Sequence, residues 1–300
     1  MQTEPLSISA VIPSFNRGHL VGRAISSALA QTVPPIEIIV VDDGSTDETE
    51  ACVAAFGGTA RYIRQDNAGA ASARNRGVRD ARGEWVAFLD SDDVWFPNHL
   101  QRIVSAINAT EGKAGFYFSD LLEERGPARG GLWHQSGFRV EGEFAFTEDA
   151  TAWAMMERQP MMLQTSVFHR ASYLAVGGMW EKLWTTEDTH LFLRMSIGGP
   201  ACAVAGLGGE LLDDDLPARR LSVSHGVMNP RHWQSTLMLW EDILIRYADL
   251  GPHYRRILID RCATSHRNLA AISFAKREFD RCLVEVLRYG AERLRRVTVR

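Results

Sequence analysis

The sequence predicts an α/β fold, with a mostly parallel sheet flanked by helices and a C-terminal helical appendage. Three observations support this prediction. Short apolar runs alternate with helix-patterned segments over residues 1–120, polar clusters follow the apolar runs, and residues 226–300 hold helical patterns alone. Alternation of this kind places parallel strands in one sheet and covers the sheet with helices.

Four apolar runs are expected to form strands. The first is broken by Pro13, and the second is apolar almost throughout, which is typical of a strand buried on both faces. The strands are expected at residues 8–12, 36–41, 61–64 and 84–89. Apolar residues at helical spacing predict a helix over 20–29, and further helices are expected from about Asp47 and over 70–81.

Polar residues gather where each of these strands ends. The four clusters lie at residues 13–17, 42–47, 66–69 and 90–93. Ligands of open α/β sheets bind at the carboxyl ends of the strands. We therefore expect the four clusters to form one site on one edge of the sheet.

The densest cluster is Asp90-Ser91-Asp92-Asp93, which follows a buried apolar run. Packed carboxylates repel one another and resist desolvation. Mg²⁺ or Mn²⁺ removes that cost, and such ions are usually held by one or two carboxylates and by substrate phosphates. The cluster predicts a platform for a metal and a diphosphate. The alternative is that Asp92 or Asp93 caps a helix beginning near Pro97.

Composition and charge are those of a globular protein. Hydrophobic residues make up 45% of the 300 residues, charged residues make up 23%, and the net charge of −4 argues against a nucleic-acid partner. The charge is uneven, because residues 276–300 carry a net +4 and the remainder −8.

Four scattered cysteines without a CxxC pair argue against a zinc site and suit a reducing compartment. The sequence shows no signal-peptide pattern and no apolar span of about 20 residues. We expect a cytoplasmic protein.

Two common phosphate-binding loops are missing from the sequence. A dehydrogenase G-x-G-x-x-G would follow the first strand, where residues 13–18 hold one glycine, and no G-x-x-x-x-G-K-[ST] occurs. A diphosphate would therefore be neutralised mainly by metal and side chains.

The N-terminal part holds a series of short motifs. They are VIPSFNR at 11–17, QT at 31–32, EIIVVDDGSTD at 37–47, NAG at 67–69, ARNRG at 73–77 and GEWVAFLDSDD at 83–93. These motifs resemble those of glycosyltransferase family 2, and the resemblance covers residues 8–93 densely and continues at 177–179 and 187–194. It implies a Rossmann-like GT-A fold and inverting transfer of a sugar from a nucleoside diphosphate, in a hexosyltransferase of surface polysaccharide or glycolipid synthesis.

The resemblance also implies the domain organisation. It gives a GT-A domain over residues 1–225, with a nucleotide-sugar-binding half at 1–120 and an acceptor-side half at 121–225. A helical region over 226–300 follows.

The resemblance assigns a nucleotide sugar to the polar clusters. Asp43 would accept a hydrogen bond from the imide N–H of uracil or thymine, with Asp42 as its polar neighbour, so UDP or dTDP is favoured. Pro13 and Phe15 would line the base, and Arg74 would lie by the nucleotide. Turn chemistry is the alternative for the two aspartates, and a surface charge for Arg74. Further contacts are expected from Asn16, Arg17, Asn67, Asp90, Ser91 and Asp93.

Within the carboxylate cluster, Asp92 matches the family's direct metal ligand. Asp90 would face ribose or metal-bound water, and Asp93 would orient the loop or touch the sugar. The expected cofactor is Mn²⁺ or Mg²⁺. His225 is a further candidate ligand, but it follows the serines of its loop, unlike the family's order, which argues against it.

Glu187 and Asp188 open a second motif at the start of an amphipathic helix. In the family, the aspartate of this pair is the general base. A positioned carboxylate that takes a proton from a sugar hydroxyl typically contributes ~10²–10⁴-fold. The alternative is helix capping, since acidic residues are favoured at helix N-termini. His190 is expected either to orient the pair or to pack.

Residues 226–300 show three apolar stripes at helical spacing, at 233–247, 258–269 and 279–286. They suit homodimerisation, a lid, or peripheral docking at the inner face of a membrane. The basic tail at 293–300 favours weak attraction to anionic lipid, unless it complements its own helix dipole.

Two alternatives to transfer of a sugar to a saccharide or glycolipid acceptor stay open. A nucleotidyltransferase would release pyrophosphate and usually carries a glycine-rich basic loop after the first strand. A non-catalytic nucleotide-sugar-binding module would not need Glu187 and Asp188.

Overall fold

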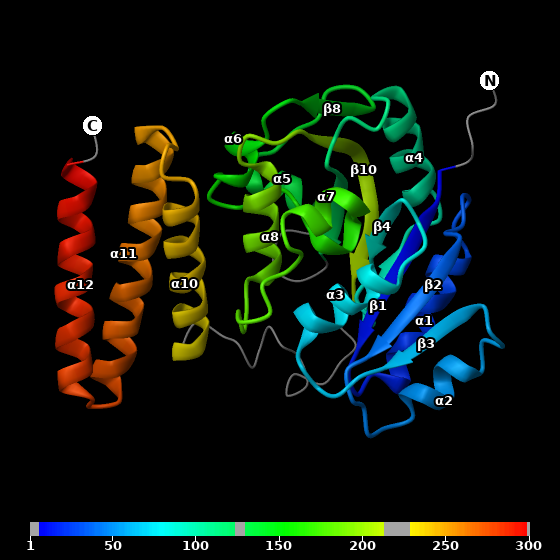
Figure 1. Ribbon diagram of the computed structural model, residues 1–300, viewed down its shortest axis with the longest axis horizontal. Helices are drawn as coiled ribbons and strands as arrows, with labels where there is room; N and C mark the ends of the chain where they lie inside the picture. Colours follow the sequence, from blue (N-terminus) through cyan, green and yellow to red (C-terminus); the bar gives the residue numbers. More distant parts are fainter. Residues whose placement is uncertain (1–5, 124–129, 213–228, 299–300) are drawn as a thin grey trace. The chain divides into compact units, whose positions relative to one another are not determined.

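The computed structural model describes residues 6–123, 130–212 and 229–298, which divide into two compact units (Figure 1). The first unit comprises residues 1–181 and 191–214, and the second 182–190 and 215–300. The predicted domain boundary at residue 225 lies outside the described residues, as do His225 and its loop.

The first part of the chain alternates strands and helices, as the apolar runs predicted. The elements are β1 (Ile8–Ser14), α1 (Gly18–Leu29), β2 (Glu37–Asp42), α2 (Thr49–Ala54), β3 (Ala60–Arg64), α3 (Ala70–Asp80) and β4 (Trp85–Phe88). Every residue of β1 and of β2 is buried, which agrees with strands covered on both faces.

The rest of the first unit completes the sheet and covers it. Its elements are β5 (Val94–Trp95), α4 (His99–Ala109), β6 (Phe116–Glu123), β7 (Gly130–Gly131), α5 (Leu132–Ser136), β8 (Phe144–Thr147), α6 (Thr151–Ala154), the 3₁₀ helix η1 (Leu163–Thr165), β9 (Ser166–His169), α7 (Arg170–Ala175), α8 (Glu187–Ser196) and β10 (Ala201–Leu211). Helix α8 begins in the second unit and ends in the first.

The sheet has the order β3-β2-β1-β4-β9-β6-β10-β5, with β7 paired to β6 and β8 to β10. The four strands β3, β2, β1 and β4 are parallel. Strand β9 runs antiparallel to both of its neighbours, β4 and β6, so β6 and β10 point the same way as the first four strands. The whole is a mixed sheet with one parallel half.

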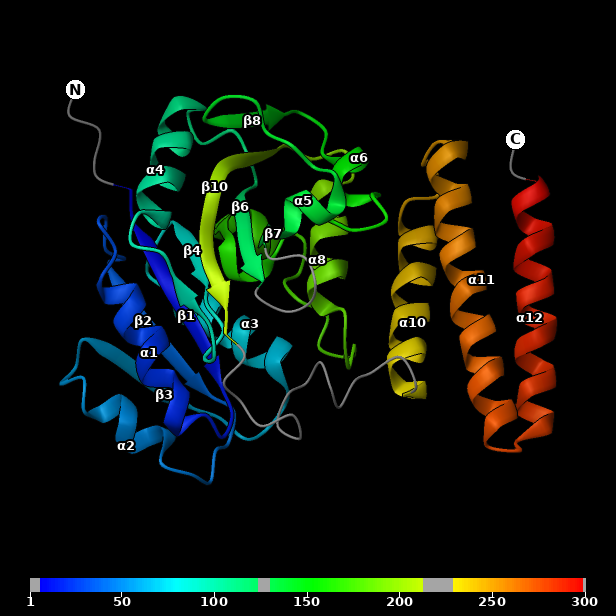
Figure 2. The ribbon, with the colours of Figure 1, turned by 180° about the vertical axis from the view of Figure 1, so that it is seen from behind.

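Helices lie on both faces of the parallel half (Figures 1 and 2). Val21, Ala24 and Ile25 of α1 pack with Ile8 and Ile12 of β1 in the main core. Helix α3 covers the other face, where a side chain on Gly77 would collide with Val11. Successive strand residues point to opposite faces, so a glycine in α3 lets the helix approach β1 closely.

Besides the start of α8, the described residues of the second unit form three helices: α10 (Pro230–Arg246), α11 (Pro252–Ala275) and α12 (Phe279–Thr298). Asn229 caps α10, since its side chain accepts the N–H of Arg231 and Pro230 occupies the first helical turn. The three predicted apolar stripes fall on these helices. None of the described helices is both long and apolar enough to cross a membrane.

Candidate active site

The carboxyl ends of the parallel strands form one polar rim. Ser14 at the end of β1 pairs in register with Asp42, and Asp42 pairs with Arg64 at the end of β3. Strand β4 ends beside β1, where Phe88 pairs with Val11 and Asp90 follows two residues later. The four predicted clusters therefore share one edge of the sheet.

Asp42 is fully buried and anchors the end of β2. Its carboxylate accepts hydrogen bonds from the Ser45 N–H at 2.8 Å, from Arg64 Nη1 at 3.4 Å and from the Tyr62 hydroxyl. Burial, and then the hydrogen bond to Asp42, raise the pKa of Tyr62 to about 12. The hydrogen bond from the Ser45 N–H is the turn interaction that was considered as the alternative role of Asp42. The buried carboxylate thus stabilises the loop after β2 and holds the end of β3.

Asp43 is bound by the loop that follows β3. Its Oδ1 accepts from Gln65 Nε2 at 2.8 Å and from the Ala68 N–H at 2.9 Å, and its Oδ2 accepts from the Gly69 N–H at 2.7 Å. Asn67 Nδ2 donates to the Asp43 carbonyl at 2.9 Å. A carboxylate accepts about four hydrogen bonds, so Oδ2 keeps one acceptor position for a ligand.

Asn16 ties the loop after β1 to the loop after β2. It adopts a left-handed backbone with φ of 52°, its N–H donates to Ser45 Oγ at 2.8 Å, and its Oδ1 accepts from the Thr46 N–H at 2.8 Å. Next to it the Phe15 side chain is 46% exposed, whereas Pro13 is buried. Of the two residues expected to line a base, Phe15 is the one that presents an open surface.

Asp90 is held from two sides. Its Oδ1 accepts from Arg74 Nη2 of α3 at 2.6 Å, and its Oδ2 accepts from Gln164 Nε2 at 3.0 Å. Arg74 is 7% exposed, which excludes the surface-charge alternative. A buried, charge-assisted pair of this length fixes the first carboxylate of the cluster in place.

Asp92 and Asp93 have different environments. Asp93 is buried and accepts the Leu212 N–H at 3.3 Å. Burial, followed by the charges of Asp90 and Asp92, raises the pKa of Asp93 to about 9. The Asp92 side chain is 34% exposed, with Oδ2 4.0 Å from Arg17 Nε. The concentration of oxygen donors and negative charge around Asp92 fits a hard divalent cation.

Helix capping does not explain this cluster. Helix α4 begins at His99, its N-cap is Asn98, and no side chain caps it. Within the described residues, the carboxylates of the cluster do not form a ready-made set of three ligands. His19, Asp47 and Glu48 do, with ligand atoms within 4.8 Å of one another. A metal at Asp92 would thus depend on substrate phosphates to complete its shell, as is usual for Mg²⁺.

Helix α3 also holds the turn at Gly177-Gly178-Met179. Asn75 Oδ1 accepts from the Met179 N–H at 2.9 Å and from Tyr173 Oη at 2.7 Å, and its Nδ2 donates to the Met179 carbonyl at 2.9 Å. Gly178 has φ of 65°, and a Cβ there would lie 2.6 Å from Asn75 Oδ1. The second glycine is therefore required both by backbone conformation and by space.

The segment that carries the predicted base belongs to the second unit, where Glu187 and Asp188 form the first turn of α8. Asp188 Oδ1 accepts the N–H of Thr189 at 2.6 Å. Thr186, directly before the pair, has φ of 64°. A left-handed β-branched residue is an outlier, and such strain persists only where surrounding contacts enforce it.

Helix α10 supplies those contacts. Ser235 Oγ accepts the N–H groups of Trp184 at 3.0 Å and Thr185 at 3.2 Å, and it donates to the Thr185 carbonyl at 2.8 Å. His190 Nε2 lies 2.9 Å from Asp242 Oδ2. The start of α8 is thus fastened on both sides of Asp188 by side chains of α10.

Several of these residues escaped sequence reasoning. Tyr62 and Arg64 could have been found as a pair, because alternate residues of a strand share a face and a strand was expected at residues 61–64. Gln164 lies 74 residues from Asp90, and no local pattern connects the two. Ser235 and Asp242 lie about 50 residues from their partners, and no local pattern indicates them.

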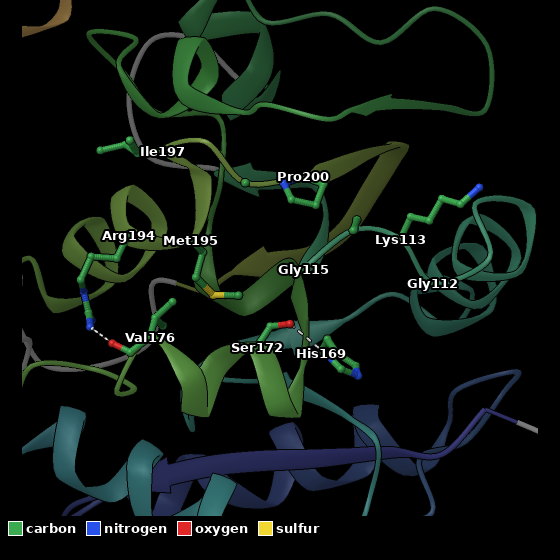
Figure 3. A pocket seen from close by; sticks show the side chains of 12 residues that line it. Gly112, Lys113, Gly115, His169, Ser172, Val176, Arg194, Met195, Ile197 and Pro200 are labelled. Carbon is green, nitrogen blue, oxygen red and sulfur yellow. Dashed lines mark hydrogen bonds between the residues drawn. The ribbon is translucent and has the colours of Figure 1, made fainter. Parts of the chain in front are cut away.

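The first unit also has a cavity of ≈ 290 Å³ away from the rim (Figure 3). It lies where β6 and β10 begin and β9 ends, so it opens at the opposite edge of the sheet. Its lining includes Gly115, His169 and Pro200, and His169 Nδ1 is 3.0 Å from Ser172 Oγ. The position of this cavity separates it from the candidate nucleotide site.

The fold matches solved glycosyltransferase structures of the GT-A class. The crystal structure of S. aureus TarS 1-349 in complex with UDP-GlcNAc aligns with a TM-score of 0.67 and 17% identity, over 89% of this chain and 80% of that chain. At this level of identity the similarity concerns the fold. The expected GT-A fold is confirmed.

The sequence comparisons match the N-terminal part of the chain to a known family. Residues 9–141 match glycosyl transferase family 2. Succinoglycan biosynthesis protein ExoO of Rhizobium meliloti (strain 1021) is 43% identical over 104 residues, which are 34% of this chain and 30% of ExoO. UDP-Glc:alpha-D-GlcNAc-diphosphoundecaprenol beta-1,3-glucosyltransferase WfgD of Escherichia coli is 40% identical over 100 residues, 33% of this chain and 40% of WfgD. The predicted resemblance to glycosyltransferase family 2 is therefore confirmed over residues 9–141.

The matches are confined to part of the relatives. The chain spans about a fifth to two fifths of the length of the curated relatives that it matches.

Proposed function

We propose that the protein is an inverting hexosyltransferase that moves a sugar from a nucleoside-diphosphate sugar to an acceptor hydroxyl. The observation that carries the proposal is the strand-end cluster, in which Arg74 and Gln164 fix Asp90 close to the partly exposed Asp92. The names of WfgD and ExoO support a sugar nucleotide as donor and an acceptor of the polysaccharide or glycolipid class.

A divalent cation, Mn²⁺ or Mg²⁺, would be held by Asp92 and by the diphosphate of the donor. When bound, it would stabilise the negative charge that develops on the leaving diphosphate. Asp90, already bound by Arg74, would face the ribose or a metal-bound water. Asp93 would orient the loop through the hydrogen bond that it accepts from the Leu212 N–H. Ser91, which follows Asp90 in the sequence, is buried.

The donor base would be uracil or thymine. The remaining acceptor position on Asp43 Oδ2 suits an imide N–H, and the exposed ring of Phe15 offers a face for stacking. Arg17 would add positive charge near the diphosphate, while Asn16 and Asn67 hold the loops that form this end of the rim.

Asp188 would be the general base. It would take the proton from the acceptor hydroxyl while the hydroxyl oxygen bonds to the anomeric carbon. The bond from that carbon to the diphosphate oxygen then breaks from the opposite face, which inverts the configuration. The strained turn before Asp188 and its fastening by Ser235 support a positioned carboxylate, and Glu187 would be its neighbour in the site.

The metal role is tested by calorimetric titration of UDP into the protein in Mn²⁺ and in EDTA. We expect UDP to bind at least tenfold more tightly with Mn²⁺, and the Asp92→Asn variant to lose that gain. Equal affinity under both conditions would remove the metal from the proposal.

Competition by dTDP, GDP and CDP tests the identity of the donor base. A preference for GDP would contradict the role of Asp43.

A nucleotidyltransferase is distinguished by its products. Incubation with a nucleotide sugar and a saccharide acceptor should release nucleoside diphosphate, whereas pyrophosphate release from a nucleoside triphosphate and a sugar phosphate would support the other class.

A further inference from the structure

Helix α12 turns its polar side toward α11, and the two helices lie side by side in the second unit (Figure 2). Glu285 of α12 is 8% exposed, and its Oε2 lies 2.6 Å from His266 Nδ1 of α11. Arg293 of α12 lies 3.3 Å from Asp260 of α11. Glu285 and Arg293 of α12 are thus used in packing against its own neighbour, which is the reverse of an ordinary amphipathic surface helix.

The apolar residues of α12 remain exposed. They recur at intervals of three, four or seven residues and so share one helix face. The exposed fractions are 60% for Phe279, 60% for Leu283, 49% for Val286, 65% for Leu287 and 71% for Leu294. Phe274 at the end of α11 is 64% exposed, and its ring lies 6.0 Å from that of Phe279. Single exposed apolar residues are common, but a continuous stripe marks an interaction surface.

Basic residues lie in the same segment as this stripe. The turn between the two helices holds the exposed Lys276 and Arg277. The Arg281 and Arg288 side chains are 61% and 59% exposed, and they pair with Glu278 at 3.3 Å and with Glu285 at 3.5 Å. Residues 276–300 carry a net +4 within a chain of net −4. The stripe and the positive charge lie in the same segment.

We propose that the exposed face of α12 and the Phe274–Phe279 turn dock onto an anionic lipid surface. The apolar side chains would enter the boundary between headgroups and acyl chains, while the lysine and arginines bind the headgroups. Charge favours this occupant over a second copy of the chain, because two copies would bring two segments of net +4 against each other. The inference depends on the second unit alone and does not require the proposed transferase activity.

The test is co-sedimentation of the full-length chain with vesicles. One set of vesicles contains phosphatidylcholine alone, and the other contains phosphatidylcholine with ~30% of the anionic lipid phosphatidylglycerol. We expect at least tenfold stronger binding to the anionic vesicles, with much of it lost in high salt. The double variant Leu283→Glu with Leu287→Glu should abolish binding. Ile245→Glu is the matched control, because Ile245 of α10 is 79% exposed outside the stripe, and it should bind as wild type.

Three outcomes would overturn the proposal. One is equal binding to neutral and anionic vesicles, and another is equal loss of binding in the Ile245→Glu control. The third is a dimer in light scattering that the double variant disperses, without vesicle binding by the wild type, since the face would then join two copies. UDP affinity measured on the same variants should stay unchanged, which separates this inference from the donor site.

Discussion

Asp90 divides its two carboxylate oxygens between Arg74, 16 residues earlier, and Gln164, 74 residues later. Because both oxygens already accept hydrogen bonds, one of them from a guanidinium group, Asp90 is poorly placed to be the principal metal ligand. Asp92, with about a third of its side chain exposed, has the accessible oxygens. The proposed roles of Asp90 and Asp92 therefore agree with the hydrogen bonds that each carboxylate already accepts.

His99, at the start of α4, gives a prediction on stability. It is fully buried, its Nδ1 lies 3.3 Å from Ser119 Oγ, and its Nε2 has no hydrogen-bond partner. Burial, with a smaller effect of Arg102, lowers the pKa of His99 to about 3. The unfolded chain would bind a proton near pH 6.5, so the stability that comes from keeping this ring neutral is complete above pH 6.5. It is lost as the pH falls from there toward 3.

Between pH 7 and pH 5, this single group should cost ~2 kcal/mol of unfolding free energy. Between pH 7 and pH 5, a His99→Gln variant should lose ~2 kcal/mol less unfolding free energy than the wild type loses. This difference does not depend on how stable the variant is at pH 7. Urea unfolding of both proteins at the two pH values measures the difference. The control is His134→Gln, since His134 is exposed. Equal pH dependence in wild type and His99→Gln would show that His99 is not the buried neutral group.

Among the secondary-structure elements, helix α10 holds the segment that carries the candidate base. Its side chains hold the backbone of Trp184 and Thr185 and the ring of His190, and Asp188 lies between these anchor points. A helix from the C-terminal region thus fixes a loop whose own sequence contains a strained residue, Thr186.

Ser235→Ala should release this loop without removing any group that touches the substrate. Since misplacement by about 1 Å can cost ~10²-fold in rate, we expect transfer to fall by ~10-fold or more, with UDP affinity unchanged. Asp188→Asn should lower transfer by ~10²-fold or more, also without loss of UDP binding. Single-turnover transfer together with UDP calorimetry separates the two steps, and Ser105→Ala, on an exposed side chain of α4, is the control. If Ser235→Ala transfers at the wild-type rate, α10 is structural only.

The sequence predicts the elements well where the pattern is local. Buried strands such as β2 read as continuous apolar runs, and the carboxylates at their ends follow from the topology of parallel sheets. The direction of β9 could not be predicted, because antiparallel insertion between β4 and β6 has no signature in a short apolar run. The partnership of Ser235 with Thr185 was equally hidden, since hydrogen bonds between distant loops leave no periodicity. The stripe on α12 was visible as a pattern, but its exposure depends on packing against α11.

At the scale of the whole molecule, the rim residues from Asp42 to Asp93 belong to the first unit, and the candidate base and the lipid-facing helix belong to the second. The charge is also uneven, because residues 276–300 of the second unit carry a net +4 and the rest of the chain −8. We therefore expect that the proposed donor binding, proton removal and surface attachment can be altered one at a time.

This division predicts where a bound donor nucleotide will stabilise the chain. A ligand that binds only the folded rim adds RT ln(1 + [L]/Kd), which is ~2.7 kcal/mol at 100 times Kd. Hydrogen exchange with saturating UDP and Mn²⁺ should therefore slow most at residues 13–17, 42–47, 64–69 and 90–93, because their backbone amides carry the rim. The amides of α11 and α12 should exchange at unchanged rates. Under the same conditions, UDP and Mn²⁺ should slow amide exchange very little in the Asp92→Asn variant. In the Asp188→Asn variant they should slow exchange as much as in the wild type. Protection centred on the α10–α12 helices, or equal protection in Asp92→Asn and wild type, would place the nucleotide away from the strand-end cluster.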